Sequence, residues 1–190
     1  MKLLIKIYFE EINPYDLLLI VDDLYSNVVD KDSTTIYIMI NNSDFTFEYD
    51  FCYINETNIP KVINYNLDNL EWDIILPIFK PCITTTYGFD LKIKEIYKKK
   101  FPKFDGVLWL NDGVQKDINI YPVIGRKYYE KTGFIYNSIY KKKNFENEFT
   151  EIMKFSVKYY FVKDIYFKSL MMKSDDDNIY NMRKKFNFLK

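Results

Sequence analysis

The chain has 190 residues, 48% of them hydrophobic and 19% aromatic, a size and composition that fit one globular domain with a sizeable core. It contains no histidine, so the usual neutral-pH acid–base group and the commonest metal ligand are both excluded. Any catalysis would therefore depend on carboxylates, lysines, tyrosines or backbone groups. Cys52 and Cys82 have no metal-type spacing and make no disulfide framework, so we expect both to be buried as small hydrophobic side chains.

Charge is unevenly distributed along the chain, although the formal net charge is zero. Residues 1–90 hold 5 lysines and 15 acidic residues, a net charge of −10, whereas residues 91–190 hold 22 basic and 12 acidic residues, a net charge of +10. Such asymmetry can steer an anionic ligand or align the molecule in an assembly, or it can reflect two solvated faces. The lysine runs 98–100 and 141–143 belong to no nucleic-acid-binding motif, so we predict no nucleic-acid partner.

The sequence predicts no membrane span. No run of about 18 apolar residues occurs, and the start of the chain is too quickly interrupted by lysine to be a signal peptide. We therefore expect a soluble protein made in a cytoplasm. The chain also lacks alanine and is rich in Ile, Asn, Lys, Tyr and Phe, a bias that AT-rich codons produce. Low-GC bacteria, their phages and some large viruses share this bias, so a virion is an alternative location.

The N-terminal part of the chain is predicted to alternate between strands and helices. We expect strands at residues 2–9, 34–40 and 45–54, and a helix at residues 14–29. A second helix is expected to begin at Asn58, with Pro60 in its first turn and Val62, Ile63 and Leu67 on one face.

The same alternation continues to the end of the chain. We expect strands at residues 74–79, 107–110, 118–124 and 159–167, and helices at residues 91–100, 125–131 and 146–157. Residues 174–190 open with Ser174 and three aspartates, and they are predicted to form a capped helical tail behind a single domain of residues 1–173. This order predicts an α/β fold with a mainly parallel central sheet flanked by helices, and ligands beyond the carboxyl ends of the strands.

Several motifs in the second half of the chain agree in order and spacing with those of a known family. They are Trp72-Asp73-Ile74, Gly88-Phe89-Asp90, Phe101-Pro102, Asp105-Gly106-Val107-Leu108-Trp109, Asn111-Asp112-Gly113, Gly125-Arg126-Lys127-Tyr128-Tyr129, Gly133-Phe134-Ile135-Tyr136 and Asn147-Glu148-Phe149-Thr150-Glu151. With them, residues 55–168 resemble small glycosyltransferase-like proteins of the A-type, nucleotide-diphospho-sugar transferase-like fold, found in bacteria and phages. The resemblance implies a nucleotide-sugar donor and carbohydrate as candidate ligands.

The metal-binding positions of that family are changed in this chain. In the family, the strand after the Trp-Asp pair ends in adjacent aspartates that hold Mn²⁺ or Mg²⁺ against the nucleotide diphosphate. Counting from Trp72 and from Gly88 places Lys80 and Pro81 there, and neither is a ligand for a hard cation. The family's histidine-containing segment after the last strand corresponds to residues 168–172, Lys-Ser-Leu-Met-Met. We therefore predict no metal site and no resident cofactor.

The resemblance also implies candidate catalytic and sugar-binding residues. Glu146 and Glu148 match the helix start at which these enzymes place a catalytic carboxylate, although both could instead only stabilise the positive end of the helix. Asp112 would reach sugar hydroxyls beside Asn111, although Asn-Asp-Gly is also typical of a tight turn.

Four further residues match the family's binding region less closely. Trp109 would stack on a sugar ring or belong to the core. Lys61 and Asn66 match positions near the nucleotide, or they lie on ordinary helix surface. Asp44, in the polar loop after the strand 34–40, could replace the acidic group under the uracil or ribose.

Three functions are compatible with these observations. The first is a degenerate glycosyltransferase-like domain with a noncatalytic binding or structural role, because the aromatic and glycine positions that preserve packing and turns are kept. The codon bias and the phage members of the family make a phage-encoded virion or accessory protein a compatible setting for it. The second is an active metal-independent glycosyltransferase, in which Lys80, with Lys168 or Lys173, replaces the cation and Glu146 or Glu148 is the base.

The third function is a carbohydrate- or protein-binding module. The 18 tyrosines and 16 phenylalanines cannot all be buried efficiently in a chain of this length, so exposed aromatic patches are expected. Such patches favour protein partners or an assembly.

Overall fold

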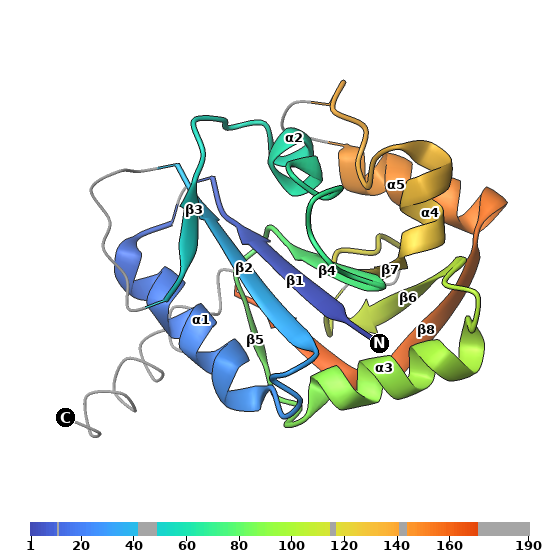
Figure 1. Ribbon diagram of the computed structural model, residues 1–190, viewed down its shortest axis with the longest axis horizontal. Coiled ribbons are helices and arrows are strands. Elements are labelled where there is room, and N and C mark those ends of the chain that lie inside the picture. Colours follow the sequence, from blue (N-terminus) through green and yellow to red (C-terminus); the bar gives the residue numbers. More distant parts are fainter. Residues whose placement is uncertain (11, 42–48, 115–116, 141–143, 171–190) are drawn as a thin grey trace.

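The computed structural model of the chain describes residues 1–10, 12–41, 49–114, 117–140 and 144–170. In chain order the elements are β1 (Leu3–Tyr8), α1 (Pro14–Asn27), β2 (Thr34–Ile40), β3 (Phe51–Tyr53), α2 (Ile59–Asn64), β4 (Ile74–Ile78), β5 (Cys82–Thr84), α3 (Phe89–Lys100), β6 (Gly106–Asn111), β7 (Pro122–Gly125), α4 (Arg126–Thr132), α5 (Phe145–Ser156) and β8 (Lys158–Ser169). Within these residues the strands form an eight-stranded sheet in the order β3-β2-β1-β4-β7-β6-β8-β5, and helices flank it (Figure 1).

The predicted α/β architecture with a mainly parallel sheet is confirmed. β1 pairs in parallel with β2 and with β4, and β2 pairs in parallel with β3. β7 runs antiparallel between β4 and β6, whereas β8 is parallel to β6 and its last residues pair antiparallel with β5. The carboxyl ends of β1, β2 and β4 therefore meet at one edge, where α/β folds place their ligands.

Helices cover both faces of the sheet, and this explains the apolar strands. Leu3, Ile5 and Ile7 of β1 belong to the core layer that contains residues of α1 and α3, whereas Leu4 and Tyr8 belong to the layer that contains residues of α2, α4 and α5. All five residues of β4 are buried for the same reason. Among the described residues, none of the helices is long and apolar enough to cross a membrane.

Some predicted boundaries differ from the structure. The strand predicted at residues 118–124 is wrong in its first part, because β7 begins at Pro122 and the backbone N–H of Asn119 donates instead to Thr150 Oγ1 at 3.0 Å. Strand β5 was not predicted. Helix α2 is capped by Asn58 as expected, but it ends at Asn64, so Leu67 lies beyond it.

Two other predictions are described only in part. Of the strand predicted at residues 45–54, residues 45–48 lie outside the described part of the chain, and β3 is the strand observed in the rest. The tail predicted at residues 174–190 also lies outside the described residues. Cys82 is buried as expected, whereas Cys52 is only partly buried.

A buried lysine anchors α2 to the sheet. Lys6 of β1 is 0% exposed, and its ammonium donates to the backbone carbonyl of Ile63 at 2.8 Å and to that of Tyr65. These carbonyls belong to the last turn of α2 and the residue after it, where helix carbonyls lack partners within the helix. Burial lowers the pKa of Lys6 to about 7. The contact fixes α2 over the carboxyl half of β1.

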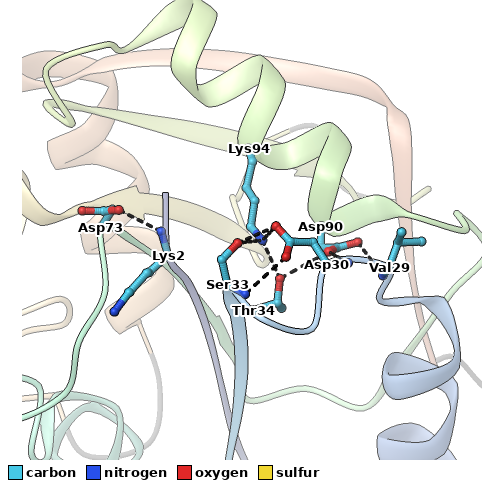
Figure 2. A network of polar contacts seen from close by, with 8 residues as sticks. All are labelled: Lys2, Val29, Asp30, Ser33, Thr34, Asp73, Asp90 and Lys94. Carbon is cyan, nitrogen blue, oxygen red and sulfur yellow. Dashed lines mark hydrogen bonds and ion pairs between the residues drawn. The ribbon is translucent and has the colours of Figure 1, made fainter.

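A second buried network ties α3 to the connection between α1 and β2 (Figure 2). Asp90, in the first turn of α3, is 0% exposed. Its carboxylate accepts hydrogen bonds from the backbone N–H groups of Val29 at 3.1 Å and Asp30 at 2.9 Å, and from Thr34 Oγ1 at 3.2 Å. Because a buried carboxylate is costly unless it is hydrogen-bonded, these three donors hold the first turn of α3 in place.

Lys94, one turn further along α3, completes this network. Its ammonium lies 2.9 Å from Asp30 Oδ2 and 2.7 Å from both Ser33 Oγ and Thr34 Oγ1. Hydrogen bonds from Ser33 and Lys94 lower the pKa of Asp30 to about 2. The network lies at the amino end of β2, away from the edge where the carboxyl ends of the strands meet, so it supports the fold.

Replacing Lys94 by Met is expected to lower the free energy of unfolding by about 1–3 kcal/mol, because charge-assisted hydrogen bonds to buried or half-buried partners are lost. The folded-state pKa of Asp30 is depressed, so its contribution is present above about pH 4 and disappears as the pH falls towards about 2. Urea unfolding at several pH values measures both effects. Lys92→Met, at an exposed position of the same helix, is the control; equal losses in the two variants would contradict the assignment.

Candidate functional site

Two predicted site residues from distant parts of the sequence meet at the carboxyl edge of the sheet. Lys80 follows β4, and Glu146 lies in the first turn of α5. Lys80 Nζ is 2.9 Å from Glu146 Oε1, and the two side chains are 29% and 13% exposed. The position after β4 and the start of α5 are therefore joined by a partly buried ion pair.

Aromatic packing beneath this ion pair holds both partners in place. Phe79 directly precedes Lys80, and Phe145 directly precedes Glu146. The rings of Phe79 and Phe145 meet edge to face at 5.0 Å, and Tyr136 contacts Phe79 at 5.5 Å and Phe145 at 4.9 Å. Such edge-to-face pairs stabilise one relative position of β4 and α5, and the ion pair follows from it.

Glu146 and Glu148 have different surroundings although both lie in the first turn of α5. The helix begins after Asn144, which has a positive φ of 77° and makes no side-chain cap, so both carboxylates can stabilise the exposed N–H groups. Only Glu146 pairs with Lys80. Burial, and next the charge of Glu148, raise the pKa of Tyr128 to about 12, which places Glu148 on the Tyr128 side of the helix.

The hydroxyl of Tyr136 lies close to Glu146 and was not identified from the sequence. Tyr136 is 1% exposed, and within the described part of the chain its hydroxyl has no hydrogen-bond partner. Burial, and next the charge of Glu146, raise the pKa of this phenol well above its usual value. An aromatic residue in an apolar run has the same sequence pattern whether or not its hydroxyl is satisfied, so no sequence signal reveals this group.

Asn111 and Asp112 form a tight turn in the structure. Asn111 Oδ1 accepts a hydrogen bond from the Gly113 N–H at 2.9 Å, and Asp112 Oδ1 accepts one from the Val114 N–H at 3.0 Å. Gly113 has a φ of +77°, a conformation that favours glycine. Asp112 is only 3% exposed, so its side chain turns inward from the loop surface. Contact of Asp112 with a sugar remains a prediction.

The other described candidate residues have local contacts of their own. Trp109 is 5% exposed, and its ring meets Phe161 edge to face at 6.0 Å, as a core residue does. Lys61 is exposed on α2 and pairs with Glu56 at 3.1 Å. Asn66 lies after α2 with a φ of 61°. Asp44 and Lys173 lie outside the described residues, and Lys168 is opposite Ile83 in the β5–β8 pair.

Two polar residues that were not proposed as site residues, Tyr8 and Asn41, lie at the carboxyl ends of β1 and β2. The Tyr8 hydroxyl donates to the backbone carbonyl of Glu56 at 3.0 Å and accepts from Asn41 Nδ2 at 3.4 Å. Burial, followed by the charges of Glu10 and Glu56, raises the pKa of Tyr8 to about 12. Tyr8 therefore acts as a neutral hydrogen-bonding group at this edge.

The residues after β4 do not fit a divalent cation. Lys80 presents an ammonium, and the backbone carbonyl of Pro81 already accepts a hydrogen bond from the Leu170 N–H at 2.9 Å. Across the described ranges, no three Cys, Asp or Glu side chains form a group that could hold a metal ion. A hard cation prefers several oxygen ligands, and this donor set does not supply them.

Comparison with solved structures shows the fold. TarS from S. aureus, in complex with UDP, has a TM-score of 0.68 at 9% identity over 96% of this chain and 64% of its own. A mannosyltransferase from Pyrobaculum calidifontis, with GDP-Man and Mn²⁺, has a TM-score of 0.64 at 8% identity over 90% of this chain and 57% of its own. A Drosophila β1,4-galactosyltransferase 7 mutant, with manganese, UDP-Gal and xylobiose, has a TM-score of 0.57 at 12% identity over 93% and 74%.

The predicted A-type, nucleotide-sugar transferase-like fold is confirmed by these structures. At such low identities the likeness extends to the fold alone. The chain spans less than two thirds of the length of the TarS and mannosyltransferase chains. No family model matches the sequence. A search of curated proteins also finds no match.

Replacing Tyr136 by Phe is expected to leave the free energy of unfolding unchanged or to raise it by about 1 kcal/mol, because the buried hydroxyl has no partner to lose. The matched control is Tyr97→Phe, since the Tyr97 hydroxyl is also buried but donates to the Gly106 carbonyl. That control should lose about 1 kcal/mol. Urea unfolding compares the two variants. A larger loss in Tyr136→Phe than in Tyr97→Phe would show that the Tyr136 hydroxyl is satisfied in the folded protein.

Proposed function

We propose that this domain is a degenerate A-type glycosyltransferase fold with a noncatalytic role in binding or in building an assembly. The observation that supports the proposal is the ion pair between Lys80 and Glu146. It unites the two positions that, by resemblance, would hold the metal-binding acid and the catalytic base. A phage-encoded virion or accessory protein fits the composition of the chain and the phage members of the family it resembles.

The first part of the argument concerns the cation. The mannosyltransferase structure contains GDP-Man and Mn²⁺, and the galactosyltransferase structure contains manganese and UDP-Gal. A divalent cation would need acidic oxygens after β4, and this chain has the Lys80 ammonium there. Like charges repel strongly when partly shielded from water, so cation binding at this position is disfavoured.

The second part concerns the base. A general base must be within hydrogen-bond reach of the proton that it removes. The Glu146 carboxylate instead lies 2.9 Å from the Lys80 ammonium, and its side chain is only 13% exposed. One of its two oxygens, Oε1, is therefore already occupied by a cationic partner. The two charges therefore neutralise each other within the protein. This arrangement supports a structural role better than it supports catalysis of glycosyl transfer.

The wild-type protein is expected to bind neither UDP nor GDP at micromolar affinity, with or without Mn²⁺. The double variant Lys80→Asp/Pro81→Asp, which restores two adjacent acids after β4, is expected to gain Mn²⁺ binding, because carboxylate oxygens suit a hard cation. Isothermal titration calorimetry measures both. Lys80→Met is the control, since it removes the ammonium without adding a ligand. Micromolar UDP or GDP binding by the wild type would contradict the noncatalytic reading.

A second candidate function is metal-independent glycosyl transfer. The observation that favours it is the 29% exposure of the Lys80 side chain, which leaves its ammonium within reach of a diphosphate at the carboxyl edge of the sheet. Lys80 would then stabilise the departing diphosphate, and Glu146, released from the pair, would accept the proton of the acceptor hydroxyl.

This second function predicts turnover of nucleotide sugars that survives EDTA and disappears in both Lys80→Ala and Glu146→Gln. Loss in both variants follows because Lys80→Ala removes the ammonium that replaces the cation after β4, and Glu146→Gln removes the proposed base that contacts this ammonium. A coupled assay for released UDP or GDP over a broad donor panel measures the turnover. Lys61→Ala, at an exposed position of α2, is the control and should retain it. No release from any donor would eliminate this function.

A further inference from the structure

The outer edge of β8 is open over its first half. Residues 158–162 of β8 pair with residues 106–110 of β6 on one side. On the other side, β5 pairs only with residues 167–169. No other strand of the described chain pairs with this outer edge. An open edge presents unpaired backbone groups that can bind another polypeptide.

Exposed aromatic side chains surround this edge. Tyr159 is 46% exposed, Tyr160 39% and Phe161 37%, and Phe155 at the end of α5 is 87% exposed. Tyr159 and Phe161 both lie near the Trp109 ring, whereas Tyr160 lies under the Lys100 ammonium at 3.9 Å. Aromatic residues therefore extend over both faces of the strand. A cluster of this kind is typical of a surface that binds a protein.

Lysines border the aromatic residues. The last turn of α3 carries Lys98, Lys99 and Lys100, all exposed, and β8 contributes Lys158 and Lys163. Asp105 neutralises Lys158 at 2.9 Å. We refer to residues 98–100, Phe155 and residues 158–163 together as the basic edge. Because the basic edge is positively charged, we expect it to bind an acidic surface.

The rest of the same chain provides acidic surface. Residues 1–90 have a net charge of −10, and three of their five lysines, Lys2, Lys61 and Lys80, already pair with carboxylates. Exposed or half-buried carboxylates occur on α1, in the segments on either side of it and directly before β3, and we refer to this set as the acidic face: Glu10, Asp16, Asp22, Asp32 and Asp50. Figure 1 shows α1, β2 and β3 on one side of the molecule and α5 and the start of β8 on the other.

We propose that the chain self-associates head to tail, with the basic edge of one copy docked on the acidic face of the next. The uneven charge along the sequence is thus largely an uneven charge in space, because β3, β2, β1 and β4 from the first half of the chain lie together in the sheet, and β7, β6 and β8 from the second half lie together beyond them. The short strand β5 is the exception, since it comes from the first half of the chain and pairs with the end of β8. Opposite charges attract across the contact, and the aromatic residues supply apolar area that water would otherwise cover.

A symmetric contact between two basic edges does not fit the charges. Such pairing would bring the lysines of residues 98–100, Lys158 and Lys163 of both copies together, and like charges across an interface cost several kcal/mol. β8 also has an irregular register between its partners Leu110 and Asn111 of β6, and bulges and lysines at an edge disfavour pairing with an identical edge. A heterologous contact avoids both problems, and it can continue from copy to copy.

This surface is distinct from the Lys80–Glu146 pair, so its test does not depend on the proposed function. Sedimentation velocity of the full chain over a range of concentrations, at low and high salt, measures self-association. We expect species larger than a monomer at low salt that dissociate at high salt, because exposed charges are screened. Three double variants complete the design: Phe155→Ser/Lys163→Glu in the basic edge, Asp32→Lys/Asp50→Lys in the acidic face, and Ile139→Ser/Lys131→Glu as a control at exposed positions elsewhere.

The basic-edge variant and the acidic-face variant should each be monomeric alone, and the control should associate like the wild type. Mixing the two monomeric variants should restore a dimer and nothing larger, because each retains one intact half of the contact. Thermal unfolding verifies that all variants are folded. A wild type that is monomeric at every concentration, association that strengthens with salt, or an acidic-face variant that still associates alone would each overturn the proposal.

Discussion

The edge-to-face contact between Phe79 and Phe145 is the interaction on which the arrangement of the candidate site depends. Every residue of β4 is buried, and the strand ends at Ile78. The ring of the next residue, Phe79, packs in the layer that contains residues of α5. Phe145 opens α5 and meets this ring at 5.0 Å. Lys80 and Glu146, which directly follow these two rings, are thereby placed next to each other. The Lys80–Glu146 pair is in this sense a consequence of apolar packing, since the aromatic contacts fix the two backbones.

Among the described residues, two charged side chains are fully buried, Lys6 in β1 and Asp90 in α3, and their surroundings separate scaffold from site. Lys6 donates to two backbone carbonyls, and Asp90 accepts from two backbone N–H groups and one hydroxyl, so both are saturated mainly by the main chain. Both are 0% exposed. Lys80 and Glu146 are partly exposed and paired through their side chains, at the edge where α/β folds bind ligands. Side-chain partners can be exchanged for a ligand more easily than main-chain partners, and this is why the pair, rather than Lys6 or Asp90, is the candidate site.

The sequence predicted long, strongly patterned elements better than short ones. β1 and β2 are apolar, β-branched runs and α1 has helical spacing of its apolar residues, and all three appear close to their predicted bounds. β5 has only three residues and carries no alternation that could be recognised. Residues 118–121 were predicted to belong to a strand, and Ile120 and Tyr121 are buried in the core. Before β7 begins, however, the Tyr121 carbonyl accepts one backbone hydrogen bond, from the Leu110 N–H at 3.3 Å, and no ladder forms. Periodicity reports burial, and burial alone does not specify hydrogen bonding to a neighbouring strand.

The candidate site was predictable as separate residues but not as a contact. Resemblance to a family assigns Lys80 and Glu146 independently, each relative to its own motif, and nothing in either motif states that the two side chains meet. The structure adds that the cation and the carboxylate neutralise each other at 2.9 Å. Tyr136 shows a different limit of the sequence. Its ring is predictable as part of the core, but whether its hydroxyl has a hydrogen-bond partner depends on neighbouring residues from α5.

An internal ammonium also changes what the fold needs in order to be stable. Carboxylates at a strand end and at a helix start repel each other unless a positive charge lies between them, and a bound metal ion supplies that charge only when it is present. In this chain Lys80 supplies it covalently, so the charge balance around α5 is independent of any ligand. If the proposed noncatalytic role is correct, the fold is retained for its surface. At the open edge of β8, exposed aromatic side chains and unpaired backbone groups stay in contact with water until a partner binds. A partner that covers this edge would therefore bury apolar area and satisfy backbone groups.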